Sequence, residues 1–181
     1  MSAEIPDPRL AGAAIAALRA DSRADVQALM ADFAAALETA GRRVAGVVQV
    51  REAGSAAGRP RIVLRDLRTG ARYPISQDLG PGSVACNLDA GELALACASV
   101  ERAAREGADL VVLSKFAKQE AQRGGLCDAF RAAMSARIPV LASVSPYFLD
   151  EWRGFAGRLA EFVAPERAAL EEWWARARRP R

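Results

Sequence analysis

The sequence predicts an α/β fold: a three-layer domain in which helices cover both faces of a mostly parallel sheet. Two observations predict it. Short apolar runs without a helical period alternate with amphipathic segments that carry helix caps, which is the order of successive βα units. The arginine-rich runs 61–68 and 72–77 flank Thr69-Gly70-Ala71, which is typical of an inserted β-hairpin.

The length of the chain predicts one domain. Its 181 residues can bury a full core but are few for two ordinary domains. Residues 1–8 are polar with two prolines, so we expect a flexible leader there. Residues 9–164 are expected to form the α/β domain, and residues 165–181 a C-terminal helical extension.

The first elements along the chain are a strand and a helix. Residues 13–18 are apolar and predict a buried strand, although alanine is a poor strand former. Residues 22–40 predict a helix, because Ser22 and Asp25 form a capping-box pattern and Gly41 ends the segment. One face of this helix is apolar and consists of Val26, Leu29, Met30, Phe33 and Leu37.

The middle of the chain predicts two more buried strands and a helix between them. The runs VAGVVQV (44–50) and DLVVLS (109–114) have no helical period, which favours parallel strands. Asp89, with Glu92 as its capping-box partner, predicts the start of a helix that reaches about residue 106. Residues 115–125 read as a polar connection.

The last third predicts helices at 126–137, 145–163 and 166–178 and a buried strand at 139–145. Ser145-Pro146 is a favourable N-cap and first-turn pair. The final helix carries Trp173 and Trp174 on one side. Either these side chains anchor a homodimer or another partner, or they pack on the core of their own chain.

Composition excludes several function classes. Histidine is absent, so there is no imidazole for Ser-His-Asp catalysis or for a zinc site. Cys86, Cys97 and Cys127 are too widely spaced for a CxxC pair, and their odd number suits the reducing cytoplasm. We therefore expect a cytoplasmic protein without a metal. A net charge of +3 does not indicate a nucleic-acid partner, and no apolar run is long enough for a membrane span.

The strongest candidate site follows the 109–114 strand, because ligands of open α/β sheets bind at the carboxyl ends of the strands. Its residues are Lys115, Lys118, Glu120, Arg123, Gly124 and Gly125. The cations and the backbone N–H groups of the two glycines, just before a helix, can hold an oxyanion. The alternative is a polar loop whose lysines pair with Glu120 or face solvent.

Two weaker candidates lie earlier in the chain. Gly80 and Gly82, with Cys86 nearby, can form a second anion cradle, but a Gly-Pro-Gly connection with a small buried cysteine is the favoured interpretation. The hairpin region carries Arg51, Arg59, Arg61, Arg65, Arg68 and Arg72. These arginines are either a docking face for an acidic partner or, as we prefer, a solvated sheet edge protected by charge.

Enzyme signatures are missing. The sequence has no G-x-x-x-x-G-K-[ST] and no G-x-G-x-x-G after a strand, and its first βα turn has neither Gly nor Lys. No acidic residue ends an apolar strand, where it would hold Mg²⁺. Catalysis is therefore not favoured, and the sequence identifies neither a catalytic residue nor a cofactor.

Several segments together carry a family resemblance. They are VAGVVQ (44–49), the arginine-rich hairpin, ISQDLGPGSVACNLD (75–89), DLVVLSKFAKQEAQRGGL (109–126), IPVLASV (138–144) and EWRGFAGRLA (151–160). Over residues 10–163 the chain resembles the bacterial domain-of-unknown-function family numbered 2478, with the tail from Glu166 outside it. The resemblance implies a fold like that of P-loop nucleoside triphosphatases, with a degenerate phosphate loop, and genes near those for molybdate transport. No activity is established for the family.

The match to the family pattern is incomplete. The family has Asn-Lys-Phe-Gly-Lys where this chain has SKFAK (114–118), and Gly-Cys-Arg-Leu-Asp where it has ACNLD (85–89). The missing glycine and arginine weaken any anion site that is carried over. The residues that match are Lys115, Lys118, Glu120, Gly80, Gly82, Cys86 and Asp89.

Three hypotheses follow. The first is a binding protein for a small oxyanion or a nucleotide phosphate, accessory to molybdenum metabolism. The second is a divergent nucleoside triphosphatase in which Lys115 or Lys118 binds phosphate and Glu120 positions water. The third is a non-catalytic interaction module that uses the arginine hairpin and the tryptophan helix.

Overall fold

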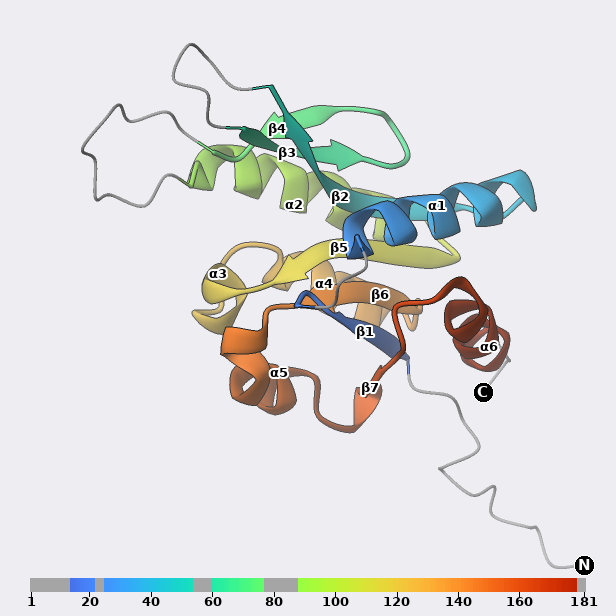
Figure 1. The fold of residues 1–181 in the computed structure, drawn as a ribbon. Helices are drawn as coiled ribbons and strands as arrows, with labels where there is room; N and C mark the ends of the chain where they lie inside the picture. Colours follow the sequence, from blue (N-terminus) through green and yellow to red (C-terminus); the bar gives the residue numbers. More distant parts are fainter. Residues whose placement is uncertain (1–13, 22–24, 54–59, 77–87, 179–181) are drawn as a thin grey trace, which may run out of the picture.

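The computed structural model describes residues 14–21, 25–53, 60–76 and 88–178. A seven-stranded sheet with the order β4-β3-β2-β5-β6-β1-β7 forms its centre (Figure 1). The strands are β1 (Ile15–Arg19), β2 (Val44–Glu52), β3 (Arg61–Asp66), β4 (Arg72–Pro74), β5 (Leu110–Phe116), β6 (Val140–Val144) and β7 (Ala160–Phe162). Neighbours from β2 to β7 pair in parallel. The hairpin β3–β4 adds two antiparallel strands, which confirms the predicted mixed sheet.

Helices cover both faces of this sheet. They are α1 (Val26–Thr39), α2 (Ala90–Arg105), α3 (Lys118–Ala121), α4 (Cys127–Ser135), α5 (Leu149–Ala156) and α6 (Arg167–Ala177), with 3₁₀ turns η1 (Pro146–Phe148) and η2 (Gly157–Leu159). One core lies between the sheet and α2, α4 and α5, and the other between the sheet and α1 and α6. The predicted three layers are therefore confirmed. None of the described helices combines the length and apolar composition that crossing a membrane requires.

Aspartates cap the two long helices. The side chain of Asp25 accepts hydrogen bonds from the backbone N–H groups of Gln27 and Ala28, so α1 begins at Val26, later than predicted. Ser22 lies outside the described residues. Asp89 caps α2 through the N–H groups of Gly91 and Glu92, which confirms the predicted start of that helix. Both helices thus point their N-termini, and their partial positive charge, toward the carboxyl edge of the parallel strands.

Residues 115–125 are not the simple polar connection that the sequence predicts. Lys115 and Phe116 complete β5, and residues 118–121 form α3. The Phe116 ring is fully buried and contacts Trp152 and Phe155 at centroid distances of 5.1 and 5.2 Å. This burial on the α4–α5 face extends the strand. The pairing of β5 with β6 shifts register between Leu113 and Phe116, so both of these side chains face the same core and Lys115 lies on the α1 side.

The predicted helix over 145–163 is wrong in its second half. The helix α5 ends at Ala156, and Gly157 adopts a left-handed backbone conformation with φ +53°. The chain then forms β7, which pairs in parallel with β1 in the register Ile15↔Ala160. Ser145 precedes the turn η1 instead of α5, and its side chain makes no cap hydrogen bond. The backbone N–H and C=O groups at the edge of β1 need hydrogen-bond partners. Supplying these partners stabilises β7 more than the local helical pattern favours a longer helix.

The C-terminal helix packs on its own chain. Leu170 and Trp173 in α6 are fully buried in the core beside α1, and Trp174 is 9% exposed. The alternative in which the two indoles pack on their own domain therefore describes this structure. A homodimer through α6 stays a prediction.

Candidate functional site

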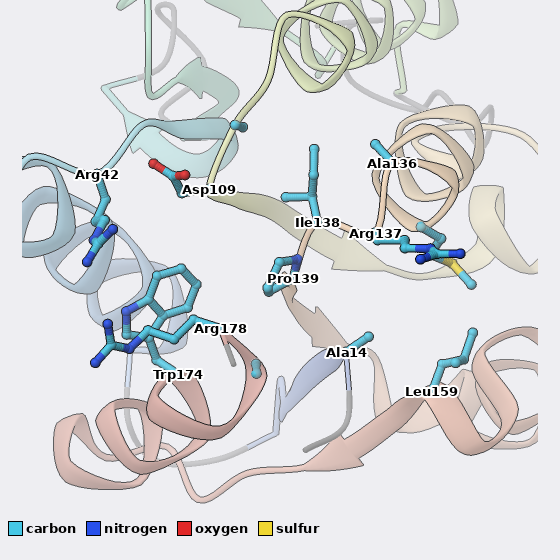
Figure 2. Close-up of a pocket in the computed structure, with 13 residues that line it drawn as sticks. Ala14, Arg42, Asp109, Ala136, Arg137, Ile138, Pro139, Leu159, Trp174 and Arg178 are labelled. Atoms are coloured by element: carbon cyan, nitrogen blue, oxygen red, sulfur yellow. The ribbon is translucent and has the colours of Figure 1, made fainter. Parts of the chain in front are cut away.

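A cavity of about 610 Å³ lies at the carboxyl edge of the parallel strands, beside the first turn of α1. The end of β2, the end of β5, and Ser143 in β6 contribute to its walls. The polar residues of its lining include Asp25, Gln27, Gln49, Arg51, Lys115 and Ser143. This is the position at which open α/β sheets bind ligands. Another cavity, of about 470 Å³, lies at the opposite, amino edge (Figure 2).

The side chain of Gln27 connects three strands at the floor of the carboxyl-edge cavity through hydrogen bonds. Its side-chain Nε2 donates to the carbonyl of Ser114 at 2.6 Å and to Ser143 Oγ at 3.3 Å. Its Oε1 accepts from the backbone N–H of Gln49 at 2.8 Å. One side chain of α1 therefore bridges β2, β5 and β6. The sequence analysis did not identify Gln27 as part of a site. Two signals were available: a glutamine in the first turn of a capped helix, and Ser143 within an otherwise apolar strand.

Two positively charged side chains, each from a different strand, line this cavity. Lys115 is half-buried near the end of β5, and Arg51 is exposed near the end of β2. Neither side chain has a hydrogen bond or ion pair with another described residue. The Lys115 ammonium group is close enough to Glu120 to oppose the rise in the pKa of that carboxyl. The cavity thus presents two cations to a bound molecule.

Asp25 places a carboxylate at the same cavity. Its Oδ1 accepts from the N–H groups of Gln27 and Ala28, both at 3.1 Å. These are donors that a phosphate would use at the start of a helix. The helix dipole of α1 is therefore already engaged by a residue of the chain itself, and a bound anion would rely on Lys115 and Arg51.

Two further residues of the predicted Lys115 segment, Glu120 and Gly124, form hydrogen bonds within the segment. Glu120 is buried, and its carboxylate accepts from the backbone N–H groups of Ala117 and Leu126, both at 3.0 Å. Burial raises the pKa of this carboxyl, and the two backbone hydrogen bonds oppose that rise. The N–H of Gly124 donates to the carbonyl of Gln119 at 2.8 Å. Glu120 and Gly124 are thus occupied in closing the loop around α3.

The structure separates the residues that the sequence grouped. Lys115 lines the carboxyl-edge cavity, whereas Glu120 and Arg123 line a different cavity of about 480 Å³ beside α5. Lys118 is exposed at the start of α3 and lines neither. Gly125 has φ +57° and packs against the Glu120 carboxylate. The predicted residues Gly80, Gly82 and Cys86 lie outside the described residues.

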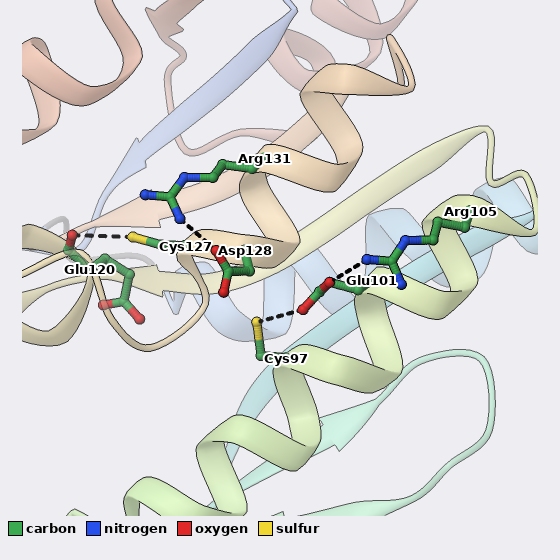
Figure 3. Close-up of polar contacts among 7 residues, drawn as sticks. All are labelled: Cys97, Glu101, Arg105, Glu120, Cys127, Asp128 and Arg131. Atoms are coloured by element: carbon green, nitrogen blue, oxygen red, sulfur yellow. Dashed lines mark hydrogen bonds and ion pairs between the residues drawn. The ribbon is translucent and has the colours of Figure 1, made fainter.

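The described cysteines are buried free thiols (Figure 3). Cys127 Sγ donates to the carbonyl of Glu120 at 3.3 Å, and Cys97 Sγ lies 3.9 Å from the carboxylate of Glu101. Burial raises the pKa of Cys97 to about 11 and also raises that of Cys127. Within the part of the chain that the structure describes, no three Cys, Asp or Glu side chains gather in a way that could hold a metal ion.

Part of the hairpin charge is neutralised locally. Arg72 forms an ion pair with Glu52, and Arg68 with Glu106. Arg51 instead faces the carboxyl-edge cavity. Arg59 is outside the described residues. The ion pairs favour the solvated-edge interpretation for this end of the sheet.

The family model described as "Protein of unknown function (DUF2478)" matches residues 15–173. The chain belongs to the DUF2478 family. The match runs beyond residue 163, where the sequence resemblance was expected to end, and it includes most of α6. Leu170 and Trp173, two of the buried side chains of that helix, therefore lie within the matched range, and Trp174 directly follows it.

One curated relative of this DUF2478 chain is the molybdenum import ATP-binding protein ModC 2 of Bradyrhizobium diazoefficiens. The two are 38% identical over 160 residues, which cover 88% of this chain but only 18% of the relative. The chain thus spans less than a fifth of that protein's length. Among solved structures, a human cancer-related nucleoside triphosphatase matches with a TM-score of 0.58 and 16% identity, over 89% of this chain and 93% of the other. This likeness confirms the expected fold, like that of nucleoside triphosphatases.

Proposed function

We propose that this DUF2478 protein binds a small oxyanion or the phosphate of a nucleotide in the carboxyl-edge cavity, as an accessory to molybdenum metabolism. The observation that carries the proposal is the position of Lys115. It lies half-buried at the carboxyl end of a central parallel strand, in a cavity of about 610 Å³, without a hydrogen bond or ion pair to another described residue. A half-buried cation interacts more strongly with an anion than a fully exposed cation does, because the surroundings have a lower dielectric constant.

The surrounding groups fit an oxyanion ligand. Arg51 adds a second positive charge with a planar set of donors that suits tetrahedral anions. Gln27 and Ser143 are held rigidly by hydrogen bonds to each other and to the sheet, so the floor of the cavity is preorganised. The carboxylate of Asp25 opposes the two cations. The site therefore favours a ligand that reaches Lys115 and Arg51 over one that must sit on the helix N-terminus.

The comparisons support the same direction. The curated relative carries the words molybdenum import and ATP-binding in its name, and the matching solved structure is called a nucleoside triphosphatase. Both names point to anions of the molybdate or phosphate class as the first ligands to test.

The test is a calorimetric titration of the full chain with molybdate, tungstate, sulfate, phosphate, Mg-ATP and Mg-GTP. We expect saturable binding of at least one, weakened about tenfold or more in Lys115→Ala, because a hydrogen bond to a charged group contributes about 1.5–3 kcal/mol. Lys118→Ala is the matched control, because Lys118 is exposed and outside the cavity. Equal affinity in the wild type and Lys115→Ala, or no binding of any of these anions, would overturn the proposal.

The geometry gives less support to a nucleoside triphosphatase. That hypothesis needs Glu120 to position water, but both oxygens of its carboxylate accept from backbone N–H groups and the side chain is 5% exposed. The α1 N-terminus, where such enzymes hold phosphate, is occupied by Asp25. Turnover of Mg-ATP or Mg-GTP that is lost in Lys115→Ala would favour the enzyme over the binding protein.

A further inference from the structure

A second cavity lies at the amino edge of the sheet, opposite the proposed oxyanion site. It has a volume of about 470 Å³, and Asp109, Ile138 and Pro139, which precede β5 and β6, form part of its wall. The last turn of α6 closes one side (Figure 2). This volume lies within the range of small-molecule sites. None of its lining residues belongs to the carboxyl-edge cavity.

Three arginines from separate parts of the fold line this cavity: Arg42 and Arg178 lie on one side of it and Arg137 on the other (Figure 2). Arg42 follows α1, Arg137 follows α4, and Arg178 ends α6. None of the three guanidinium groups has a hydrogen bond or ion pair with another described residue. By contrast, neighbouring arginines are neutralised, since Arg43 pairs with Asp109 and Arg68 with Glu106. The cavity therefore combines a net positive charge with unused donors.

The one carboxylate in the described wall does not neutralise these arginines. Asp109 accepts from the backbone N–H of Arg43 at 2.8 Å and pairs with the Arg43 guanidinium at 3.6 Å. Its charge is thus directed to a residue outside the cavity wall. An external anion would complete the arginine cluster, and guanidinium groups bind phosphate with paired hydrogen bonds.

An aromatic side chain lies next to the charge. In Figure 2 the Arg42 and Arg178 side chains lie beside the Trp174 indole, and Arg137 lies across the cavity. The Trp174 ring contacts Trp173 at a centroid distance of 6.3 Å, so it is fixed from the core side. Its 9% exposed surface and Pro139 give the cavity an apolar part. A ligand that fits both parts carries an anionic group on a flat apolar body.

We propose that the amino-edge cavity is a second ligand site that binds phosphomonoesters of planar aromatic molecules, the class that includes nucleoside monophosphates. Arg42 and Arg178 bind the phosphate, Trp174 contacts the ring, and Arg137 adds positive charge from the far side. This site is independent of the proposed oxyanion site, because the two lie at opposite edges of the sheet.

The test uses calorimetry and NMR titration of the full chain with AMP and phenyl phosphate, and with adenosine and inorganic phosphate as partial ligands. We expect AMP and phenyl phosphate to bind more tightly than either partial ligand. Arg42→Gln and Arg178→Gln should each weaken AMP binding about tenfold. Both side chains are exposed, so these variants should keep their fold, which circular dichroism checks. Arg102→Gln, an exposed arginine on α2 outside this cavity, is the matched control.

Two further variants separate this proposal from the function proposed above. Lys115→Ala should leave AMP binding at the amino edge unchanged. Trp174→Leu should weaken AMP and phenyl phosphate but not inorganic phosphate. AMP binding that is lost in Lys115→Ala but kept in Arg42→Gln and Arg178→Gln would overturn the amino-edge site. Absence of phosphomonoester binding, with binding of a glutamate-rich peptide in its place, would also overturn it.

Discussion

The Glu120 carboxylate occupies the space that a side chain at Gly125 would need. A Cβ built on Gly125 overlaps Oε1 of Glu120, and the residue has φ +57°, a conformation that favours glycine. Because of this close approach, one carboxylate accepts from the backbone N–H groups of Ala117 and Leu126 and closes the loop that contains α3. The loop in turn fixes the end of β5, where Lys115 lies.

Gly125→Ala is therefore expected to destabilise the protein by about 2 kcal/mol or more, because a Cβ displaces the carboxylate and the backbone is strained. Urea unfolding followed by circular dichroism measures this difference. Gly124→Ala is the matched control, since a Cβ there meets Gln119 at an ordinary 3.5 Å. Equal stability of the two variants would contradict the assigned role of Gly125.

Most of the fold could be predicted from the sequence, because buried strands and helices have characteristic patterns of apolar residues. The runs 44–50, 109–114 and 139–145 are mostly apolar, and they correspond to the central strands β2, β5 and β6. The sequence did not predict β7, because three residues are too few to show an alternation of apolar and polar side chains. This strand forms through its pairing with β1. The extension of β5 to Phe116 also depends on a contact distant in sequence, the aromatic cluster with Trp152 and Phe155.

The candidate site was predictable only in part. Lys115 was identified from its place after an apolar strand, and it lines the cavity there. Gln27 and Arg51 were not assigned to that site, because they reach it from α1 and β2 and only the sheet order brings them together. Glu120 and Gly124 matched an anion-binding pattern, yet both are used in local hydrogen bonds. A spacing pattern cannot distinguish a polar group that is available to a ligand from one that already has a hydrogen bond within the protein.

Glu120 gives the stability a defined pH dependence. Its pKa is raised above the usual 4.5, chiefly by burial. Between the two values the folded state binds more protons than the unfolded state, so stability falls as the pH rises. We therefore expect the free energy of unfolding of the wild type, relative to Glu120→Gln, to fall from pH 4 upward and to level off above the raised pKa. Urea unfolding of both proteins at several pH values measures this, and a rise in the difference across that window would contradict it.

The buried thiols should be unreactive in the folded protein. Burial raises the pKa of Cys97 to about 11 and raises that of Cys127, and the thiolate is the reactive form. In a Cys86→Ser background, both should react slowly with a thiol reagent at pH 8 and rapidly in urea. With a chromogenic disulfide reagent, the absorbance of the thiol that the reagent releases measures the reaction rate. Rapid labelling of either cysteine under folding conditions, with the far-ultraviolet circular dichroism unchanged, would contradict the assigned burial.

Asp25 sets the charge of the proposed oxyanion site as well as the start of α1. Asparagine caps helices about as well as aspartate, so Asp25→Asn should keep α1 stable while removing a negative charge from the cavity. The affinity for the oxyanion should then rise about three- to tenfold, because repulsion of about 1 kcal/mol between two charges is lost. The titrations used for Lys115→Ala measure this rise. Asp89→Asn removes the equivalent cap carboxylate from α2, which does not line the cavity, and should leave the affinity unchanged. Unchanged or weaker binding in Asp25→Asn would mean that the anion does not approach the N-terminus of α1.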